Sequence, residues 1–146
     1  MNTIARPWRS FFAVFALTLF SAGCTVKFIS DYDEVLDRSI TQFQHKAETL
    51  LTTLEQQSPT PKYAAHQKDY VALKADISSM AMRAKAFDKN ELTVQQLEKL
   101  LSLVSDWETA HKMGLTAEEI PTLRTPLNVA CTAILKLEIA KKRGKD

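Results

Sequence analysis

Apolar residues recur at alternating spacings of four and three along most of this chain of 146 residues. The clearest segment has them at Leu36, Ile40, Phe43, Ala47, Leu50 and Leu54. Because an α-helix turns once in about 3.6 residues, this spacing places all six on one face. The chain has only 3 Gly and 5 Pro, which disfavours a turn-rich β-sandwich. The pattern therefore predicts long amphipathic helices that bury their apolar faces against one another.

Breaks in this pattern divide the chain into four predicted helices and predict an all-α fold. They run from Asp31 to Gln57, from Pro61 to about Asn90, from about Thr93 to Gly114, and from Pro126 to Lys142. Short links between such helices favour an antiparallel (up-down) four-helix bundle of residues 31–142, with a frayed tail at 143–146. The alternative is a pair of long helical hairpins that complete their core by dimerising.

Capping residues set the predicted helix starts. Asp31 with Glu34 three residues later forms a capping pair for the first helix. Thr60-Pro61 supplies an N-cap and a proline at the first position of the second helix. Thr93 with Gln96 completes a capping box for the third helix.

Glycine and proline set the remaining boundaries. Gly114 is the only glycine in the predicted bundle, and we expect it in the left-handed conformation that ends many helices. Leu115 supplies the apolar contact that accompanies such an end. Pro121 and Pro126 argue against one long helix across this region, so the fourth helix is predicted to start at Thr125-Pro126.

The N-terminus has the pattern of an export signal. Arg6 and Arg9 precede ten residues, 11–20, of which only Thr18 is polar, and Ser21-Ala22-Gly23 then supplies small residues. A basic start, a short apolar run and small residues before a cleavage site describe a secretory signal peptide, here residues 1–23. The apolar run is well below the roughly 20 residues that span a bilayer, so we do not expect it to remain as a membrane span.

Ala22-Gly23-Cys24 resembles a bacterial lipobox, although Ser21 stands where leucine is commonest. The resemblance implies a diacylglyceryl thioether on Cys24, cleavage before it and acylation of its new amino group. Ordinary cleavage after Ala22 or Gly23 is the alternative, with a disulfide between Cys24 and Cys131 in an exported protein. Cys131 lies in an apolar helical stretch, which favours a buried, inert thiol and leaves Cys24 as the lipidation site.

Residues 24–30 form a short, partly apolar tether without a Gly/Ser-rich linker, so we expect the bundle to lie close to the bilayer. Thr25, not aspartate, follows Cys24. In lipoproteins of Gram-negative bacteria this implies the outer membrane, facing the periplasm, although the inner membrane is possible. Arg6 and Arg9 account for the net charge of +2, which leaves equal numbers of cations and anions from Cys24 onward. This balance argues against binding to nucleic acid.

The catalytic and metal-binding residue types in the sequence predict neither an enzyme nor a cofactor. Glu108 and His111 have the Glu-x-x-His spacing of di-iron bundles, but the chain has no second such pair among His45, His66 and the acids around them. We therefore expect Glu108 and His111 to be ordinary residues near a helix end, with His111 favoured by the helix dipole. Motifs of serine hydrolases, phosphate-binding loops and zinc sites are absent from the sequence.

The aromatic residues of the predicted bundle lie on or beside the predicted stripes, which favours a role in the core over a ligand cage. They are Tyr32, Phe43, Tyr63, Tyr70, Phe87 and Trp107. Aspartates interrupt the lysines of the second helix, such as Lys68, Lys74 and Lys85, which favours a solvated face over contact with lipid headgroups or peptidoglycan.

The run Ile29-Ser30-Asp31-Tyr32-Asp33-Glu34, with further positions up to Leu54-Glu55, resembles the opening of a family of small, uncharacterised helical bacterial lipoproteins. The resemblance implies location and fold and brings no catalytic residues. We expect a structural or protein-interaction role as a scaffold for an unknown protein partner. The alternative is a helical bundle that binds a small ligand or a metal.

Overall fold

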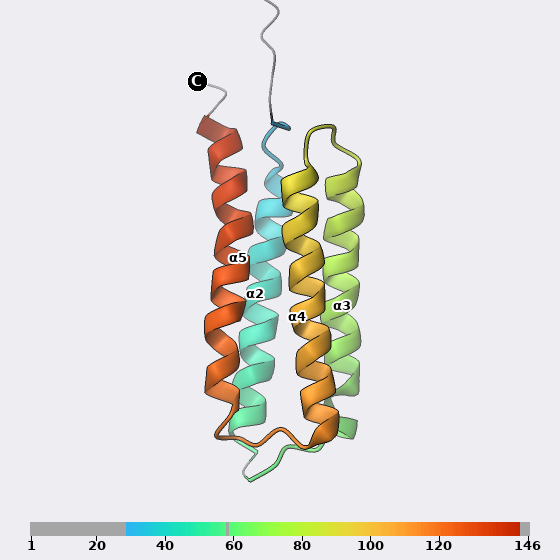
Figure 1. Cartoon of the computed structure of the whole chain (residues 1–146), viewed down its shortest axis with the longest axis vertical. Coiled ribbons are helices and arrows are strands. Elements are labelled where there is room, and N and C mark those ends of the chain that lie inside the picture. Colours follow the sequence, from blue (N-terminus) through green and yellow to red (C-terminus); the bar gives the residue numbers. More distant parts are fainter. Residues whose placement is uncertain (1–28, 58, 144–146) are drawn as a thin grey trace, which may run out of the picture.

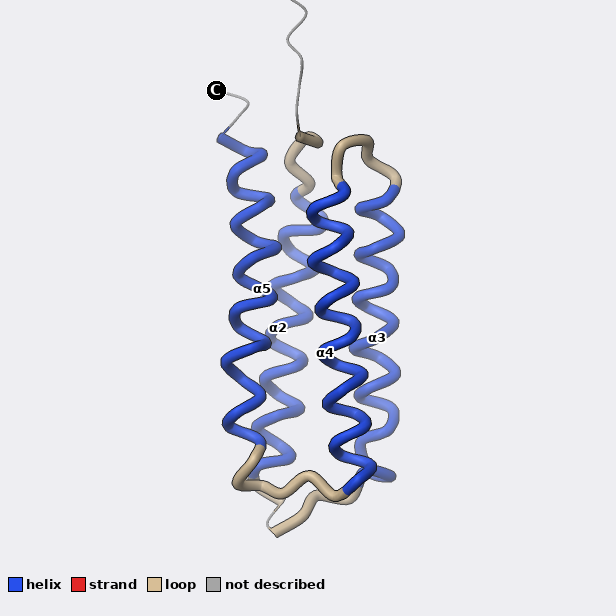
Figure 2. The backbone as a smooth tube through the Cα atoms, viewed as in Figure 1, coloured by secondary structure: helices blue, strands red, loops and turns tan. Residues whose placement is uncertain are grey.

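The computed structural model describes residues 29–57 and 59–143, which form four long helices joined by short loops (Figures 1 and 2). The helices are α2 (Glu34–Glu55), α3 (Tyr63–Lys85), α4 (Glu91–Met113) and α5 (Ile120–Arg143). No described residue lies in a β-strand. The predicted all-α, antiparallel four-helix bundle is confirmed, and its core closes within one chain.

Each helix packs against two neighbours: α2 and α4 both contact α3 and α5, and the α3–α4 contact is the most extensive. The start of α2, the α3–α4 loop and the end of α5 lie together at one end, which we call the proximal end (Figure 1). The α2–α3 and α4–α5 loops lie at the opposite, distal end. The chain therefore enters and leaves the described bundle at its proximal end.

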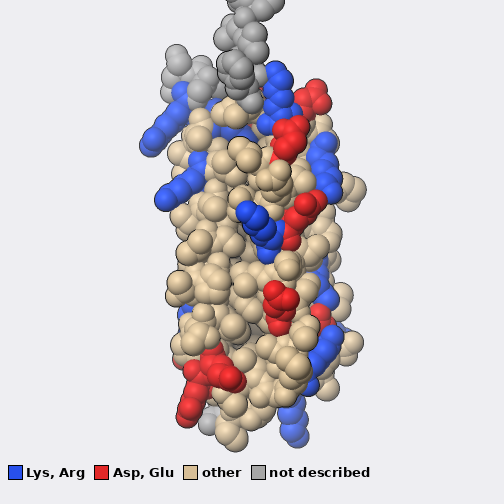
Figure 3. All heavy atoms as spheres, viewed as in Figure 1, with Lys and Arg blue, Asp and Glu red and all other residues tan. Residues whose placement is uncertain are grey.

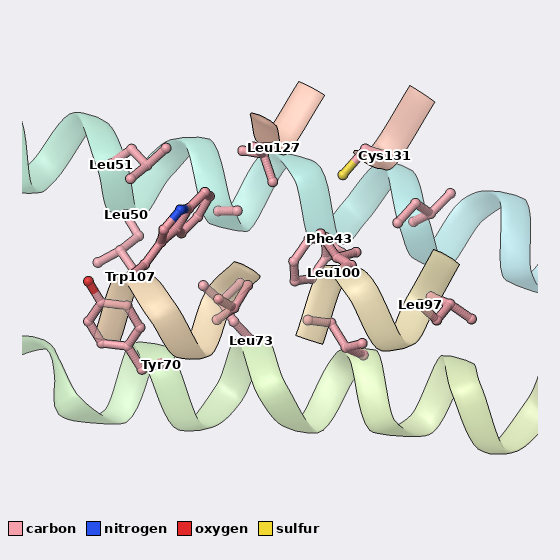
Figure 4. Close-up of a cluster of buried hydrophobic side chains, with 14 of the residues drawn as sticks. Phe43, Leu50, Leu51, Tyr70, Leu73, Leu97, Leu100, Trp107, Leu127 and Cys131 are labelled. Atoms are coloured by element: carbon pink, nitrogen blue, oxygen red, sulfur yellow. The ribbon is translucent and has the colours of Figure 1, made fainter. Parts of the chain in front are cut away.

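The apolar stripes form the core as predicted. All six stripe residues of α2, from Leu36 to Leu54, are buried. Side chains from all four helices point toward one another in the interior (Figure 4). Burial of a leucine or phenylalanine side chain stabilises a protein by about 1.5–3 kcal/mol, so this shared interior is the main stabilising term.

Two predicted helix starts are wrong because the capping side chains act differently. Asp33 caps α2 instead of Asp31: its Oδ1 accepts hydrogen bonds from the backbone of Val35 (3.0 Å) and Leu36 (3.3 Å). The helix α4 begins at Glu91, and Thr93 lies buried inside its first turn. The Thr93 hydroxyl is used by a buried lysine of α5 and does not cap its own helix.

The predicted start of α3 is also displaced. The helix begins at Tyr63, after Lys62, which makes no side-chain capping bond. Pro61 lies before the helix and is buried, and its carbonyl oxygen accepts a hydrogen bond from His111 Nε2 (3.1 Å). Tertiary contact with α4 therefore determines the backbone here, instead of the local Thr60-Pro61 signal.

The helix α5 begins at Ile120, six residues before Pro126, so the predicted start at Thr125-Pro126 is wrong. Pro121 lies in the first turn, where its missing N–H is not needed. Pro126 lies inside the helix, which costs about 3 kcal/mol. Full burial of Ile120 and ion pairs from Arg124 Nε and Nη1 to Glu48 (3.0 Å) and Glu55 (2.8 Å) of α2 offset that cost.

The predicted C-terminal end of α4 is confirmed. Gly114 has φ 106°, in the left-handed region. Its N–H bonds to the carbonyl of His111 (3.2 Å), and the N–H of Leu115 bonds to the carbonyl of Ala110 (3.1 Å). Leu115 is buried, as the apolar contact of such an end requires.

Candidate functional site

The predicted lipidation site, Cys24, lies outside the described residues, together with the whole predicted signal peptide. The second cysteine, Cys131, is fully buried in the core and is a free thiol, as predicted. Burial raises the pKa of this thiol to about 12, which makes it unreactive at neutral pH. None of the described helices has the length and apolarity needed to cross a membrane.

A buried polar cluster, which we call the proximal cluster, joins all four helices at the proximal end. One half of it is Asp33, whose carboxylate binds Arg83 of α3 through two bonds, Nε–Oδ2 at 2.5 Å and Nη2–Oδ1 at 2.9 Å. Burial acts to raise the pKa of Asp33. The bonds from Arg83 and from the backbone of Leu36 and Val35 outweigh burial, so the pKa lies below its ordinary value. Asp33 is therefore an anion that holds α2 to α3.

The other half of the proximal cluster is an ion pair within α5. Glu138 is fully buried and accepts bonds from Lys141 Nζ and from the backbone N–H of Asp33 (3.1 Å). Lys141 Nζ also donates to Asn90 Oδ1 (2.6 Å) and Thr93 Oγ1 (3.0 Å), both on the α4 side. All three ammonium protons have an acceptor, which is the condition under which a buried charge is tolerated.

The segment before α2 belongs to the same cluster. Ser30, at the end of the predicted tether, is buried, and its hydroxyl donates to Asn90 Oδ1 (3.0 Å). Its backbone N–H donates to the carbonyl of Lys89 (3.1 Å). The chain is therefore fixed to the α3–α4 loop before the first helix begins.

Sequence reasoning missed the proximal cluster, and a signal for it existed. Glu138 and Lys141 follow Leu127, Cys131 and Ile134 at spacings of four and three, so they continue the apolar stripe. The side chain of Lys141 is almost completely buried, although a lysine near the end of a chain is usually solvated.

A second polar cluster, the distal cluster, surrounds Glu108 at the other end. Its carboxylate accepts from Lys74 Nζ (2.5 Å), Tyr63 Oη (2.7 Å) and Lys112 Nζ (3.0 Å). The bond from Lys74, followed by those from Tyr63 and Lys112, lowers the pKa of Glu108 to about 2. Glu108 therefore stays ionised and links α3 to α4.

His111 lies near the end of α4, as predicted, but the helix dipole is not what holds it. Its Nε2 donates to the carbonyl of Pro61 (3.1 Å), which leaves Nδ1 to accept from Tyr70 Oη (3.1 Å). Burial lowers the pKa of His111, which favours the neutral ring. His111 is therefore a buried structural group with partners on α3 and on the segment before it.

A groove runs along the surface between α2 and α3, and we call it the α2–α3 groove. Its distal part has a volume of about 430 Å³ and is lined by His45, His66 and Asp69 over Leu50 and Leu73. His66 Nδ1 lies 3.1 Å from Asp69 Oδ2, and its Nε2 lies 3.0 Å from Gln57 Oε1. The structure thus brings two of the three histidines to one groove.

Histidine and glutamate side chains can bind metal ions, so the arrangement of the histidines and Glu108 bears on a metal site. Within residues 29–57 and 59–143, no group of three or more His, Cys, Asp or Glu side chains converges as a metal site would require. Glu108 and His111 have separate partners: Glu108 contacts Tyr63, Lys74 and Lys112, and His111 contacts Tyr70 and Pro61.

The aromatic residues divide between core and surface. Phe43, Tyr70 and Trp107 are buried, as predicted, whereas Tyr63 is half-buried and Phe87 is exposed. The indole N–H of Trp107 is the one buried side-chain polar atom without a hydrogen-bond partner among the described residues. Leaving such a group unpaired costs about 1–3 kcal/mol.

Comparison of the chain with family models, curated proteins and solved structures found no match. The resemblance to small helical lipoproteins therefore stays a prediction from the sequence.

Proposed function

We propose that the chain is a bacterial lipoprotein, anchored by lipid on Cys24 and acting as a small helical scaffold at a membrane surface that faces the periplasm. The observation that carries the proposal is the order of the first 24 residues: a basic start, a short apolar run and Ala22-Gly23-Cys24. We place it at the outer membrane because Thr25 follows the cysteine.

The bundle supports a scaffold role. Its buried charges hold helices together: Asp33 binds Arg83, Glu138 binds Lys141, and Glu108 binds lysines of α3 and α4. On the face visible in Figure 3, cations and anions are interspersed. A mixed surface of this kind suits a protein partner better than it suits a polyanion such as nucleic acid.

Replacement of Cys24 by Ala in the full chain tests the anchor. We expect the wild type to incorporate labelled fatty acid and to fractionate with membranes, and the variant to do neither. A Cys131→Ala variant is the matched control, because its buried thiol should not affect either readout. Membrane fractionation of the Cys24→Ala variant without fatty acid would contradict lipidation.

In-cell crosslinking tests the scaffold role. We expect the tagged wild type to yield defined protein adducts that decrease sharply in the Cys24→Ala variant, because the partner is reached at the membrane. Adducts no different from those of an untagged strain would argue against a protein partner.

The α2–α3 groove supports a second candidate, the binding of a small ligand. Its volume of about 430 Å³ lies within the usual range of ligand pockets, and the exposed His45 lies in its lining over an apolar floor. Native mass spectrometry and metal analysis of the purified protein test this candidate. A mass equal to that of the lipidated polypeptide alone, with no metal, would exclude it.

A further inference from the structure

Exposed apolar side chains gather at the proximal end of the bundle. Nine large hydrophobic residues are exposed in the described part of the chain. Six of them belong to this end, and we call them the proximal ring: Ile29, Val35, Met82, Phe87, Leu92 and Ile139. The other three lie elsewhere: Val71 and Val129 near the middle of their helices and Met113 at the distal end.

All four helices contribute to the proximal ring. Val35 and Leu92 are the second residues of α2 and α4, whereas Met82 and Ile139 lie three and four residues before the last residues of α3 and α5. At a rise of about 1.5 Å per residue, each of these four positions lies within roughly 6 Å of the proximal end of its own helix. One partner docked on a side of the bundle would cover only part of such a ring.

A bilayer fits residues at this distance from the helix ends. The headgroup layer on each side of the hydrocarbon core is roughly 5–8 Å thick. It accepts charged side chains as well as apolar ones, and the proximal end offers both. Lys142 lies over the ring of Tyr32 at 5.3 Å, and cations gather over the upper part of α5 (Figure 3). Glu91 and Asp88 are also exposed, which suits a zwitterionic layer better than a purely anionic one.

The chain length supports the same partner. Ile29 follows Cys24 by five residues, which span at most about 18 Å when fully extended. If Cys24 carries lipid, as the proposed function holds, the end of the bundle that contains Ile29 stays within this distance of the membrane. The proximal ring is therefore the described surface that the anchor brings to the bilayer.

We propose that the proximal end docks end-on into the headgroup layer of the membrane, so that the helices stand along the membrane normal. This inference rests on the proposed anchor and goes beyond it, because a lipid tether alone would leave the bundle free to tumble. The distal cluster and the distal part of the α2–α3 groove then face away from the membrane.

Labels at matched positions test the orientation. A thiol-reactive fluorophore is attached to single cysteine variants. Val35→Cys and Leu92→Cys carry it in the proximal ring, Val71→Cys near the middle of α3, and Met113→Cys at the distal end. Val35 and Val71 are the same residue type with similar exposure, 51% and 56%. Cys131 is buried and does not react with the reagent, and lipidation blocks Cys24. The lipidated product of the full chain, which begins at Cys24, is reconstituted in vesicles of phosphatidylethanolamine and phosphatidylglycerol that contain headgroup spin-labelled lipid.

We expect the labels at positions 35 and 92 to be quenched several-fold more by the spin-labelled lipid than those at 71 and 113, and several-fold less by aqueous iodide. Equal quenching at all four positions, in protein that co-sediments with the vesicles, would overturn the docking and leave the anchor intact. Failure to co-sediment would instead overturn the anchor, and the docking with it. Energy transfer between proximal labels on different chains would assign the ring to a second copy and also overturn the proposal.

Discussion

The buried pair of Glu138 and Lys141 offers a strong test of how this bundle is held together. We consider Lys141→Met, which keeps the length of the side chain and removes its charge. The variant leaves the fully buried Glu138 carboxylate without the cation that contacts it. It also removes the donor to Asn90 and Thr93 of the proximal cluster.

Removal of one partner from a buried ion pair costs about 3–5 kcal/mol, because the other charge stays buried without compensation. Total stabilities of single domains are about 5–15 kcal/mol, so this single change removes a large share. Replacing both residues, as Glu138→Leu with Lys141→Met, is often nearly neutral. Here the backbone N–H of Asp33 still loses its acceptor, which costs about 1–3 kcal/mol. The double variant is therefore expected to be more stable than Lys141→Met.

Urea unfolding of the chain from Cys24 onward measures these differences. Trp107 is its only tryptophan and is buried, so its fluorescence follows the loss of the core. Lys136→Met is the matched control: the same substitution, in the same helix, at an exposed position, with an expected effect within about 0.5 kcal/mol. A double variant that is no more stable than Lys141→Met would refute the reasoning, because the two charges would then not be coupled.

Three further predictions concern the distal end. Glu108→Gln is expected to flatten the pH dependence of stability. Because the pKa of Glu108 is lowered to about 2, its ionised carboxylate contributes fully to stability above about pH 4.5, and this contribution is lost as the pH falls toward 2. The unfolding midpoint measured as a function of pH checks this. Gly114→Ala is expected to cost about 1 kcal/mol in urea unfolding, because φ is 106° there while no atom lies within 4 Å of the added Cβ; no loss would contradict the strain argument. Tyr70→Phe leaves the buried Nδ1 of His111 without its donor and is expected to cost about 1–3 kcal/mol in thermal unfolding; an unchanged midpoint would contradict this hydrogen bond.

The apolar spacing was sufficient to predict the four helices and their packing. The stripe from Leu36 to Leu54 is buried throughout, because a spacing of three and four kept over so many residues indicates one apolar face of an α-helix. The end of α4 at Gly114 was equally predictable, since few other residues adopt a positive φ at the end of a helix.

Helix starts were less predictable because distant contacts override local signals. Thr93 has the local pattern of an N-cap, yet its hydroxyl accepts from Lys141, 48 residues away. Pro126 has the local pattern of a helix start, yet Arg124 already binds Glu48 and Glu55 of α2, which keeps the preceding turn helical. The sequence contains both partners in each case but does not show that they meet.

The polar clusters were missed because charge at the end of a helix usually indicates solvent, whereas here it continues a buried stripe. This placement has a mechanical consequence. The segment that leads from Cys24 into the bundle is held at Ser30 by Asn90 and Lys89, and at Asp33 by Arg83 and Glu138. These contacts connect it to α3, α4 and α5 as well as to its own helix. If Cys24 carries lipid, as proposed, these contacts distribute force applied through the lipid over all four helices, so that the force does not fray α2 alone. The same contacts fix residues 30 and 33 at the end of the bundle that carries the proximal ring, which is the arrangement that end-on docking requires.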